Sequence, residues 1–166
     1  YANRGATLPS EIANWDGVTD TDWQDLVYRP ASFQNFGISA SGGTEKASFL
    51  LSGNYIKRGG VVIGEGFEKY STRLSLQARP TDRFEASLSV APNYSIEEAS
   101  GLEWPYGPTL PHALAAEMSP ITPVRNPDGS YALGVNNMVS PLESAESYNR
   151  DIQRFRMIAN AYVSYE

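Results

Sequence analysis

Segments in which apolar and polar residues alternate constrain the fold of this chain more than any other feature. From position 84 to 94, apolar residues stand at every second position, with mostly Ser, Asn or Glu between them. Successive side chains of a β-strand point to opposite faces, so this period predicts a strand with one apolar and one polar face. The apolar set is Phe84, Ala86, Leu88, Val90 and Tyr94, and the polar set is Glu85, Ser87, Ser89 and Asn93.

Four other segments follow the same pattern, although Leu50 and Ile56 interrupt it in one of them. No long helical period is present, so the sequence predicts an all-β fold of about five antiparallel strands. Residues 1–31 are expected to form a polar lead-in or external loop, and residues 95–149 a long external loop rich in Pro and aromatic residues. The predicted strands lie near 32–41, 47–56, 70–78, 84–94 and 152–165.

The lengths of the connections favour an up-and-down transmembrane β-barrel. Short turns are predicted at 42–46 and 79–83, and longer connections at 57–67 and 95–149. Barrels of the outer membrane alternate short periplasmic turns with long extracellular loops in this way. The two short turns are therefore expected on the periplasmic side and the two long connections outside the cell.

The spacing of aromatic residues also favours a membrane barrel. Phe84 and Tyr94 stand ten residues apart on the apolar face, as do Phe155 and Tyr165. At about 3.3 Å per residue and a tilt of about 40°, this length corresponds to a lipid-facing band of about 25 Å. The polar face is rich in Ser, Asn and Gly, which suits a crowded or water-filled lumen.

About five strands cannot enclose a lumen, and an open sheet edge in lipid leaves backbone groups unsatisfied. The expectation is therefore a stretch of a larger barrel. The start of the chain has no basic segment followed by an apolar one, as a secretion signal would, so a processed chain or an internal fragment is expected. Alternation alone fits two other hypotheses, a soluble β-sandwich that binds carbohydrate and a passive or structural segment of an outer-membrane barrel.

Composition argues against several other classes of protein. No run of residues approaches the roughly 18 apolar positions of a membrane-spanning helix. A net charge of -6 argues against a nucleic-acid partner, and the absence of cysteine excludes disulfides and thiolate metal sites. His112 is the single histidine and has no nucleophile motif beside it. We therefore expect no enzyme, no catalytic residues, no metal and no cofactor.

Six short segments follow one another along the chain: Thr21-Asp22-Trp23-Gln24-Asp25-Leu26, Gln34-Asn35, Ser39-Ala40-Ser41-Gly42-Gly43-Thr44-Glu45-Lys46, Gly59-Gly60-Val61-Val62-Ile63, Gly66-Phe67-Glu68-Lys69-Tyr70 and Asn126-Pro127-Asp128-Gly129-Ser130-Tyr131. Taken in this order, they resemble the SusC/RagA-like family of TonB-dependent outer-membrane transporters near the start of the barrel. The resemblance covers most of 21–165, and the ordered set of segments is more specific than any one of them.

The resemblance implies a large barrel in the bacterial outer membrane, with a plug inside it. It also implies uptake of a small-molecule or oligomeric nutrient, such as an oligosaccharide or a peptide, with a SusD-like surface lipoprotein as a lid. Energy would come through TonB. The plug, the segment that contacts TonB and the N-terminal extension of such transporters match nothing in this chain.

Two groups of residues are candidates for functional sites. Trp104, Tyr106 and Tyr131 belong to the predicted external loop, where exposed aromatic rings could stack on sugar rings or form a small core of the loop. Arg73, Glu85, Arg154 and Arg156 stand at polar positions of the predicted strands and are expected to form an ionic network in the lumen.

The lead-in carries a further group of acidic residues, Asp16, Asp20, Asp22 and Asp25. They could gather around a calcium ion, but their spacing differs from that of an EF-hand, so a solvated loop is the preferred interpretation. Trp23 is expected to pack at the base of the loop, with neighbouring carboxylates capping a turn.

Overall fold

The computed structural model describes residues 10–101, 103–104, 107–108 and 110–165. Its chain divides into two compact units. The first, the loop unit, comprises Tyr1–Pro30, Val61–Glu65 and Ala99–Arg150. The second, the sheet unit, comprises Ala31–Gly60, Gly66–Glu98 and Asp151–Glu166.

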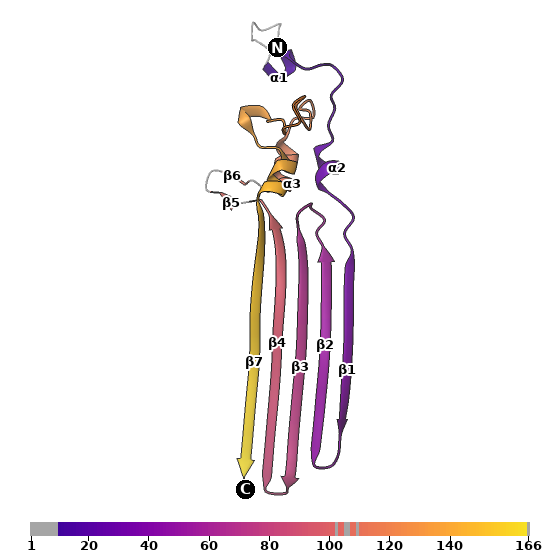
Figure 1. Ribbon diagram of the computed structural model, residues 1–166, viewed down its shortest axis with the longest axis vertical. Helices are drawn as coiled ribbons and strands as arrows, with labels where there is room; N and C mark the ends of the chain where they lie inside the picture. The colour runs from indigo at the N-terminus through magenta and orange to yellow at the C-terminus, as the bar shows by residue number, and fades with distance from the viewer. Residues whose placement is uncertain (1–9, 102, 105–106, 109, 166) are drawn as a thin grey trace. The chain divides into compact units, whose positions relative to one another are not determined.

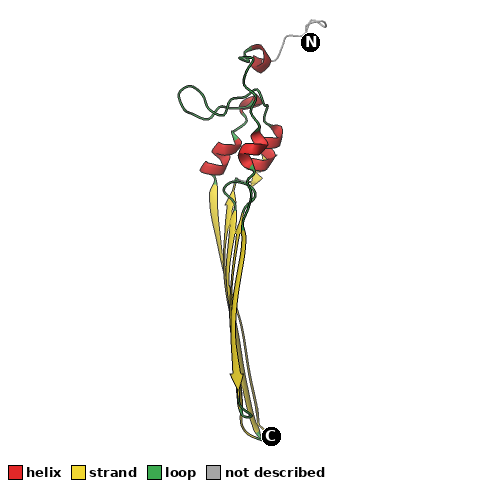
Figure 2. Ribbon diagram, turned by 90° about the vertical axis from the view of Figure 1, so that its right-hand side faces the viewer, coloured by secondary structure: helices red, strands yellow, loops and turns green. Residues whose placement is uncertain are grey.

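The sheet unit is built on one antiparallel sheet of five strands, in which neighbours in sequence are neighbours in space (Figure 1). Their order is β1-β2-β3-β4-β7. Figure 2 shows this sheet nearly edge-on, as a single twisted layer. The all-β antiparallel fold predicted from the alternation is confirmed. The strands are β1 (Phe33–Gly43), β2 (Ala47–Gly59), β3 (Gly66–Thr81), β4 (Phe84–Ser100) and β7 (Asn149–Tyr165).

All five strands extend beyond the predicted segments at one end or both, and β2 and β3 do so at the connection between them. The sequence predicted a long loop over 57–67, whereas β2 continues to Gly59 and β3 begins at Gly66. Cross-strand contacts explain the difference, because Lys57 lies opposite Glu68 and forms an ion pair with it at 2.6 Å. Charged residues that look like a loop in the sequence therefore pair within the sheet.

Two tight turns close the other ends of these hairpins. In the β1–β2 turn the hydroxyl of Thr44 accepts hydrogen bonds from the backbone N–H groups of Lys46 and Ala47, each at 3.2 Å. In the β3–β4 turn Thr81 lies opposite Phe84, and the register shifts between Ala78 and Thr81. Both connections are short, as the sequence indicates.

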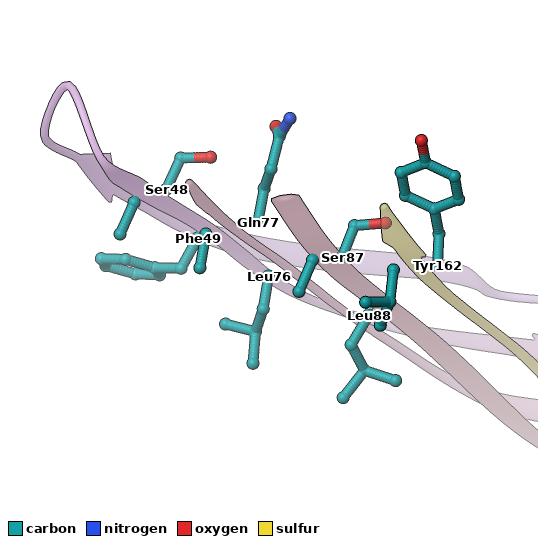
Figure 3. A pocket seen from close by; sticks show the side chains of 11 residues that line it. Ser48, Phe49, Leu76, Gln77, Ser87, Leu88 and Tyr162 are labelled. Atoms are coloured by element: carbon teal, nitrogen blue, oxygen red, sulfur yellow. The ribbon is translucent and has the colours of Figure 1, made fainter. Parts of the chain in front are cut away.

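The register places the apolar residues of neighbouring strands on one face, called here the apolar face. Leu51, Leu74 and Val90 follow one another across β2, β3 and β4, because Leu51 lies opposite Leu74 and Leu74 opposite Val90. Phe49, Leu76 and Leu88 form the adjacent row, and Figure 3 shows these three side chains on the same side of the sheet. Ser48, Gln77, Ser87 and Tyr162 point to the other side, called here the polar face (Figure 3).

The loop unit contains the short helices of the chain. They are α1 (Ser10–Ala13), α2 (Trp23–Val27), α3 (Pro111–Glu117), the 3₁₀ turn η2 (Val135–Asn137) and α4 (Pro141–Ser147), and a two-stranded sheet pairs β5 (Glu103–Trp104) with β6 (Gly107–Pro108). No helix in the described ranges is long and apolar enough to cross a membrane.

A small core holds together the parts of the loop unit that are distant in sequence. Trp23 and Val27 of α2 are 3% and 0% exposed and cluster with Val62, Ala115 and Met118. The indole N–H of Trp23 also donates to the carbonyl of Ser119 at 3.0 Å. The segment 95–149, predicted as one external loop, is partly helical and shares its core with residues 23–27 and 62.

Candidate functional site

The apolar face carries a row of tyrosines at one level of the sheet. Tyr55 lies opposite Tyr70, and Tyr70 opposite Tyr94. Their ring centroids are 4.9 Å and 6.4 Å apart along the row. One step beyond this row are Lys57 and Glu68, and the hydroxyl of Tyr70 donates to Glu68 at 3.0 Å. The apolar band thus ends at amphipathic rings followed by charged groups, which is how a lipid-facing surface ends at a membrane interface.

At the opposite end of this band the apolar face has a shallow hollow of about 430 Å³. Ala47, Ala78 and Ala86 stand in register there, next to the row of larger residues formed by Phe49, Leu76 and Leu88. The hollow arises because three small side chains stand beside three large ones (Figure 3). Nothing in its lining on this face is polar, so it offers no group for catalysis or specific binding.

The polar face carries a second cross-strand row at the level just beyond the tyrosines. Arg58 of β2 lies between Phe33 of β1 and Phe67 of β3 in the register. Its guanidinium carbon lies 5.5 Å from the centroid of the Phe33 ring and 5.9 Å from that of Phe67. Both rings attract the cation. The two contacts restrict the guanidinium of an exposed arginine.

The same row continues into β4 and β7 through an ion pair. Phe67 lies opposite Glu97, and the carboxylate of Glu97 accepts a hydrogen bond from Nη1 of Arg154. The row Phe33–Arg58–Phe67–Glu97–Arg154 thus crosses all the strands of the sheet. It contains two aromatic rings, two cations and one carboxylate.

The four polar residues singled out in the sequence lie on the polar face but do not form one network. Glu85 pairs with Arg79, whose Nη2 lies 2.6 Å from its carboxylate, and it also accepts from the amide of Gln77 at 2.9 Å. Arg154 pairs with Glu97, at the other end of the sheet. Among the described residues no ion pair joins Arg73 or Arg156 to a carboxylate. The expected common network is therefore replaced by two separate pairs and two cations without an acidic partner.

Of the three predicted loop aromatics, Tyr131 is the one whose surroundings are described. Its hydroxyl accepts from Nη2 of Arg125 at 2.8 Å, and the guanidinium carbon lies 4.0 Å from its ring centroid. Partial burial raises the pKa of Tyr131, and a hydrogen bond to Glu146 acts in the same direction. Trp104 belongs to β5, opposite Gly107, and Tyr106 lies outside the described residues.

A small hollow that the sequence did not indicate lies elsewhere in the loop unit. Its volume is about 250 Å³, and it is lined by Asn14, Trp15, Asp16, Thr19, Ile121, Thr122, Pro123 and Leu133. Trp15, which is 44% exposed, contributes its ring, and Asp16 and Asn14 contribute polar groups. An exposed tryptophan next to acidic and amide residues was the signal available in the sequence, but the facing wall comes from residues about a hundred positions away.

Two of the acidic residues of the lead-in, Asp16 and Asp22, act as backbone caps. Asp16 accepts from the backbone N–H groups of Val18 and Thr19 at 2.9 and 2.7 Å, and these contacts, those of Thr19 first, lower its pKa. Asp22 is the N-cap of α2 and accepts from Gln24 and Asp25. Within the described ranges no group of three or more acidic or histidine side chains could hold a metal ion.

Comparison with known proteins finds relatives of one kind, TonB-dependent receptors. No protein-family model matches the sequence. The chain is 29% identical to TonB-dependent receptor P26 of Formosa agariphila over 170 residues, covering 99% of this chain and 16% of that receptor. It is 28% identical to TonB-dependent receptor P3 of the same organism over 159 residues, covering 90% of this chain and 16% of that receptor. Against TonB-dependent receptor SusC of Bacteroides thetaiotaomicron, identity is 23% over 189 residues, covering 100% of this chain and 18% of SusC.

This chain is similar to one segment of a SusC-like TonB-dependent receptor. These matches confirm the resemblance to SusC-like TonB-dependent receptors that the ordered sequence segments predicted. The SusC-like chain spans less than a fifth of the length of each of these relatives. Its sheet accordingly supplies part of an all-β wall. The matched relatives are receptors and not enzymes.

Proposed function

We propose that the SusC-like chain forms part of the wall of an outer-membrane receptor that imports a nutrient with energy from TonB. The observation that carries the proposal is the sheet with two unlike faces. One face is an apolar band that ends at the Tyr55–Tyr70–Tyr94 row, and the other is lined mainly by Ser, Asn, Gln and basic residues, with Leu50, Ile56, Phe33 and Phe67 among them. In a barrel the first face contacts lipid and the second faces the lumen.

The lengths of the connections set the orientation of this wall. The short β1–β2 and β3–β4 turns lie on the periplasmic side, and the connections 60–65 and 101–148 lie outside the cell. The tyrosine row and the Lys57–Glu68 pair lie toward the ends of β2 and β3 that lead into the 60–65 connection. They therefore stand at the extracellular interface of the membrane. Arg58 and its two phenylalanines are then near the outer end of the lumen.

The proposed protein partners are inferred from the similarity to TonB-dependent receptors, among them SusC. A SusD-like surface lipoprotein would cover the extracellular side, and TonB would act through parts of the receptor that correspond to none of these residues. The nutrient is an oligosaccharide or a peptide. Trp104, Tyr106 and Tyr131 are proposed to contact it from the extracellular loops, and Arg73, Glu85, Arg154 and Arg156 to line its path.

The orientation of the two faces is tested by cysteine labelling, which is simple because this chain contains no cysteine. Leu74→Cys and Ser75→Cys are made separately in the intact receptor, in a background without other accessible cysteines, in outer-membrane vesicles. We expect a membrane-impermeant maleimide to label Ser75→Cys and a lipid-soluble reagent to label Leu74→Cys. Recovery of the protein outside membranes, with Leu74→Cys protected from both reagents, would support the soluble β-sandwich instead.

Energised uptake is tested in cells that produce the intact receptor. Deletion of the TonB gene is expected to abolish uptake of a radiolabelled oligosaccharide or peptide that the receptor binds. A SusD-like lipoprotein should co-purify with the receptor in mild detergent. Uptake that persists without TonB would show a passive barrel and would contradict the proposal.

A further inference from the structure

The charge of the polar face is opposite to that of the chain. The whole sequence has a net charge of -6, yet five basic side chains of the sheet unit lie on the half of the polar face near the β2–β3 connection. We call them the basic patch. The carboxylate on this half of the face is Glu97, and Arg154 neutralises it. The basic patch consists of Arg58, Lys69, Arg73, Arg154 and Arg156.

Register fixes the positions of these residues. Arg58 lies opposite Phe67, so Lys69 is its diagonal neighbour on β3, two residues further along the same face. Arg73 follows four residues after Lys69, at about 13 Å for 3.3 Å per residue. On β7, Arg156 follows Arg154 by two residues, at about 7 Å. The cations are thus spread along the strands and do not converge on one point.

Most of the basic patch has no internal counter-charge. In the described part of the chain no carboxylate forms an ion pair with Arg58, Lys69, Arg73 or Arg156. The contacts of Arg58 are with the faces of two phenyl rings, which leaves the N–H edge of its guanidinium available. Such an edge matches a carboxylate or a sulfate, which can accept two parallel hydrogen bonds from it.

Uncharged polar residues separate the cations. Between the levels of Lys69 and Arg73 lies a row in which Asn54 is opposite Ser71 and Ser71 opposite Asn93. Asn54 donates to Asn35 at 2.7 Å and to the carbonyl of Phe36 at 3.3 Å. Amides and hydroxyls both donate and accept, so they match the hydroxyl groups of a ligand between its charges.

We propose that the basic patch selects an acidic oligosaccharide, one whose sugar units carry carboxylate or sulfate groups, over a neutral one. Arg58 holds the first acidic group at the outer end of the lumen, and Lys69, Arg73 and Arg156 attract the groups that follow. The Asn and Ser row contacts hydroxyls between them. This inference rests on the proposed function, because it requires the polar face to line the path of the ligand.

Binding of defined probes to the intact receptor, with its lipoprotein, tests the proposal. The probes are tetragalacturonate, a sulfated galactan tetrasaccharide and the neutral maltotetraose, measured by calorimetry at low and high NaCl. We expect at least one acidic probe to bind about tenfold or more tightly than maltotetraose, with an affinity that falls as salt screens the charges. The two acidic probes distinguish recognition of carboxylate from recognition of sulfate.

Matched variants locate the effect. Arg58→Gln and Arg73→Gln should each weaken binding of the acidic probe several-fold and leave maltotetraose unaffected. Lys46→Gln removes the same charge from the β1–β2 turn, away from the basic patch and from the residues proposed to line the path, and should not change binding. Equal loss in all three variants would show a general charge effect and overturn the assignment.

A different outcome would point to a protein segment as the occupant. In that case neither acidic probe binds, and Arg58→Gln and Arg73→Gln instead lower the thermal stability of the receptor more than Lys46→Gln does. This result would overturn the ligand proposal. The cysteine-labelling result separates failure of the proposed function from failure of this inference. If the faces are oriented as proposed but acidic probes do not bind, only the inference about the basic patch fails.

Discussion

At the scale of single residues, Trp23 determines how the loop unit holds together. It belongs to a helix of five residues, which is too short to be stable by itself. Its ring packs against residues from the 61–65 connection and from α3, and its N–H satisfies the carbonyl of Ser119. One side chain therefore joins three segments that are far apart in the sequence.

Replacing Trp23 by Ala should destabilise the loop unit by about 3–5 kcal/mol, because a fully buried aromatic ring is removed. Hydrogen exchange of the intact receptor measures this change as faster exchange of the α3 amides at 114–118. Trp15→Ala is the matched control, since that ring is 44% exposed, and it should leave the exchange of α3 nearly unchanged. Similar exchange in the two variants would contradict the role given to Trp23.

A second prediction at this scale concerns the hairpin 125–131 and its response to pH. The carboxylate of Asp128 accepts from the hydroxyl and the backbone N–H of Ser130, at 2.6 and 2.9 Å. These contacts, the hydroxyl first, lower the pKa of Asp128 below its ordinary value of 3.8. Because the folded pKa is the lower one, the stabilisation is complete above about pH 3.8 and is lost as pH falls through the folded value.

Ser130→Ala removes the largest cause of this shift and should move the pKa of Asp128 back toward 3.8. The measurement is a carbon-13 NMR titration of the receptor labelled at the aspartate carboxyl carbons. Ser147→Ala, at the end of α4, serves as a control that should leave this resonance unaffected. An unchanged pKa in Ser130→Ala would show that the hydroxyl does not stabilise the carboxylate.

At the scale of elements, the hairpins depend on glycines that the alternation does not explain. A Cβ at Gly43 would lie 2.8 Å from the carbonyl oxygen of Ala47 and 3.0 Å from Cβ of Ser48. At Gly53 the nearest atom would be Cγ2 of Ile38, at 3.8 Å. The first position is closed by backbone of the partner strand, whereas the second is open.

Gly43→Ala should therefore destabilise the barrel by about 1–3 kcal/mol, the usual range for overpacking. Gly53→Ala should change stability little or raise it slightly, since alanine restricts the unfolded chain. Urea unfolding of the receptor in detergent, followed by the mobility of unheated samples on gels, compares the two. A larger loss in Gly53→Ala than in Gly43→Ala would contradict the geometry of the β1–β2 turn.

The strands were predictable because alternation depends on burial of one face, and that signal is local. The helices α3 and α4 were missed because each has seven residues, which is about two turns and too few for a helical period to emerge. Their Pro residues at the first turn, Pro111 and Pro141, were available as start signals. What stabilises them is contact with distant residues such as Trp23, and a local pattern does not contain that information.

For the candidate site, the face on which each residue lies was predictable, whereas its interaction partners were not. Alternation placed Arg73, Glu85, Arg154 and Arg156 on one face, and the register agrees. Their partners depend on how far each strand continues, and β4 extends to Ser100 and so places Glu97 beside Arg154. Arg58 was missed because its segment resembled a loop, although Arg flanked across the register by Phe33 and Phe67 is visible once the strands are aligned.

At the scale of the whole molecule, the two faces should respond differently to the same charge. Leu74→Arg puts a guanidinium into the apolar band and should cost about 2–4 kcal/mol in a membrane, if it lies near the midplane. Ser75→Arg places the same group on the polar face and should cost much less. Refolding yield and unfolding free energy in lipid vesicles measure the difference. Equal costs would show that lipid does not cover the apolar face.

The alternation of the two faces also restricts how such a wall can change in evolution. Inserting or deleting one residue within β2 or β3 would exchange the two faces from that point onward, so that Leu51 or Leu74 would turn to the lumen and basic residues to lipid. Changes of two residues would keep the faces but shift the rows of side chains. In the segment between β4 and β7, an insertion or deletion of one residue does not exchange two faces of a strand. Length variation among relatives should therefore accumulate there, where it can alter what the receptor binds without disturbing the strands.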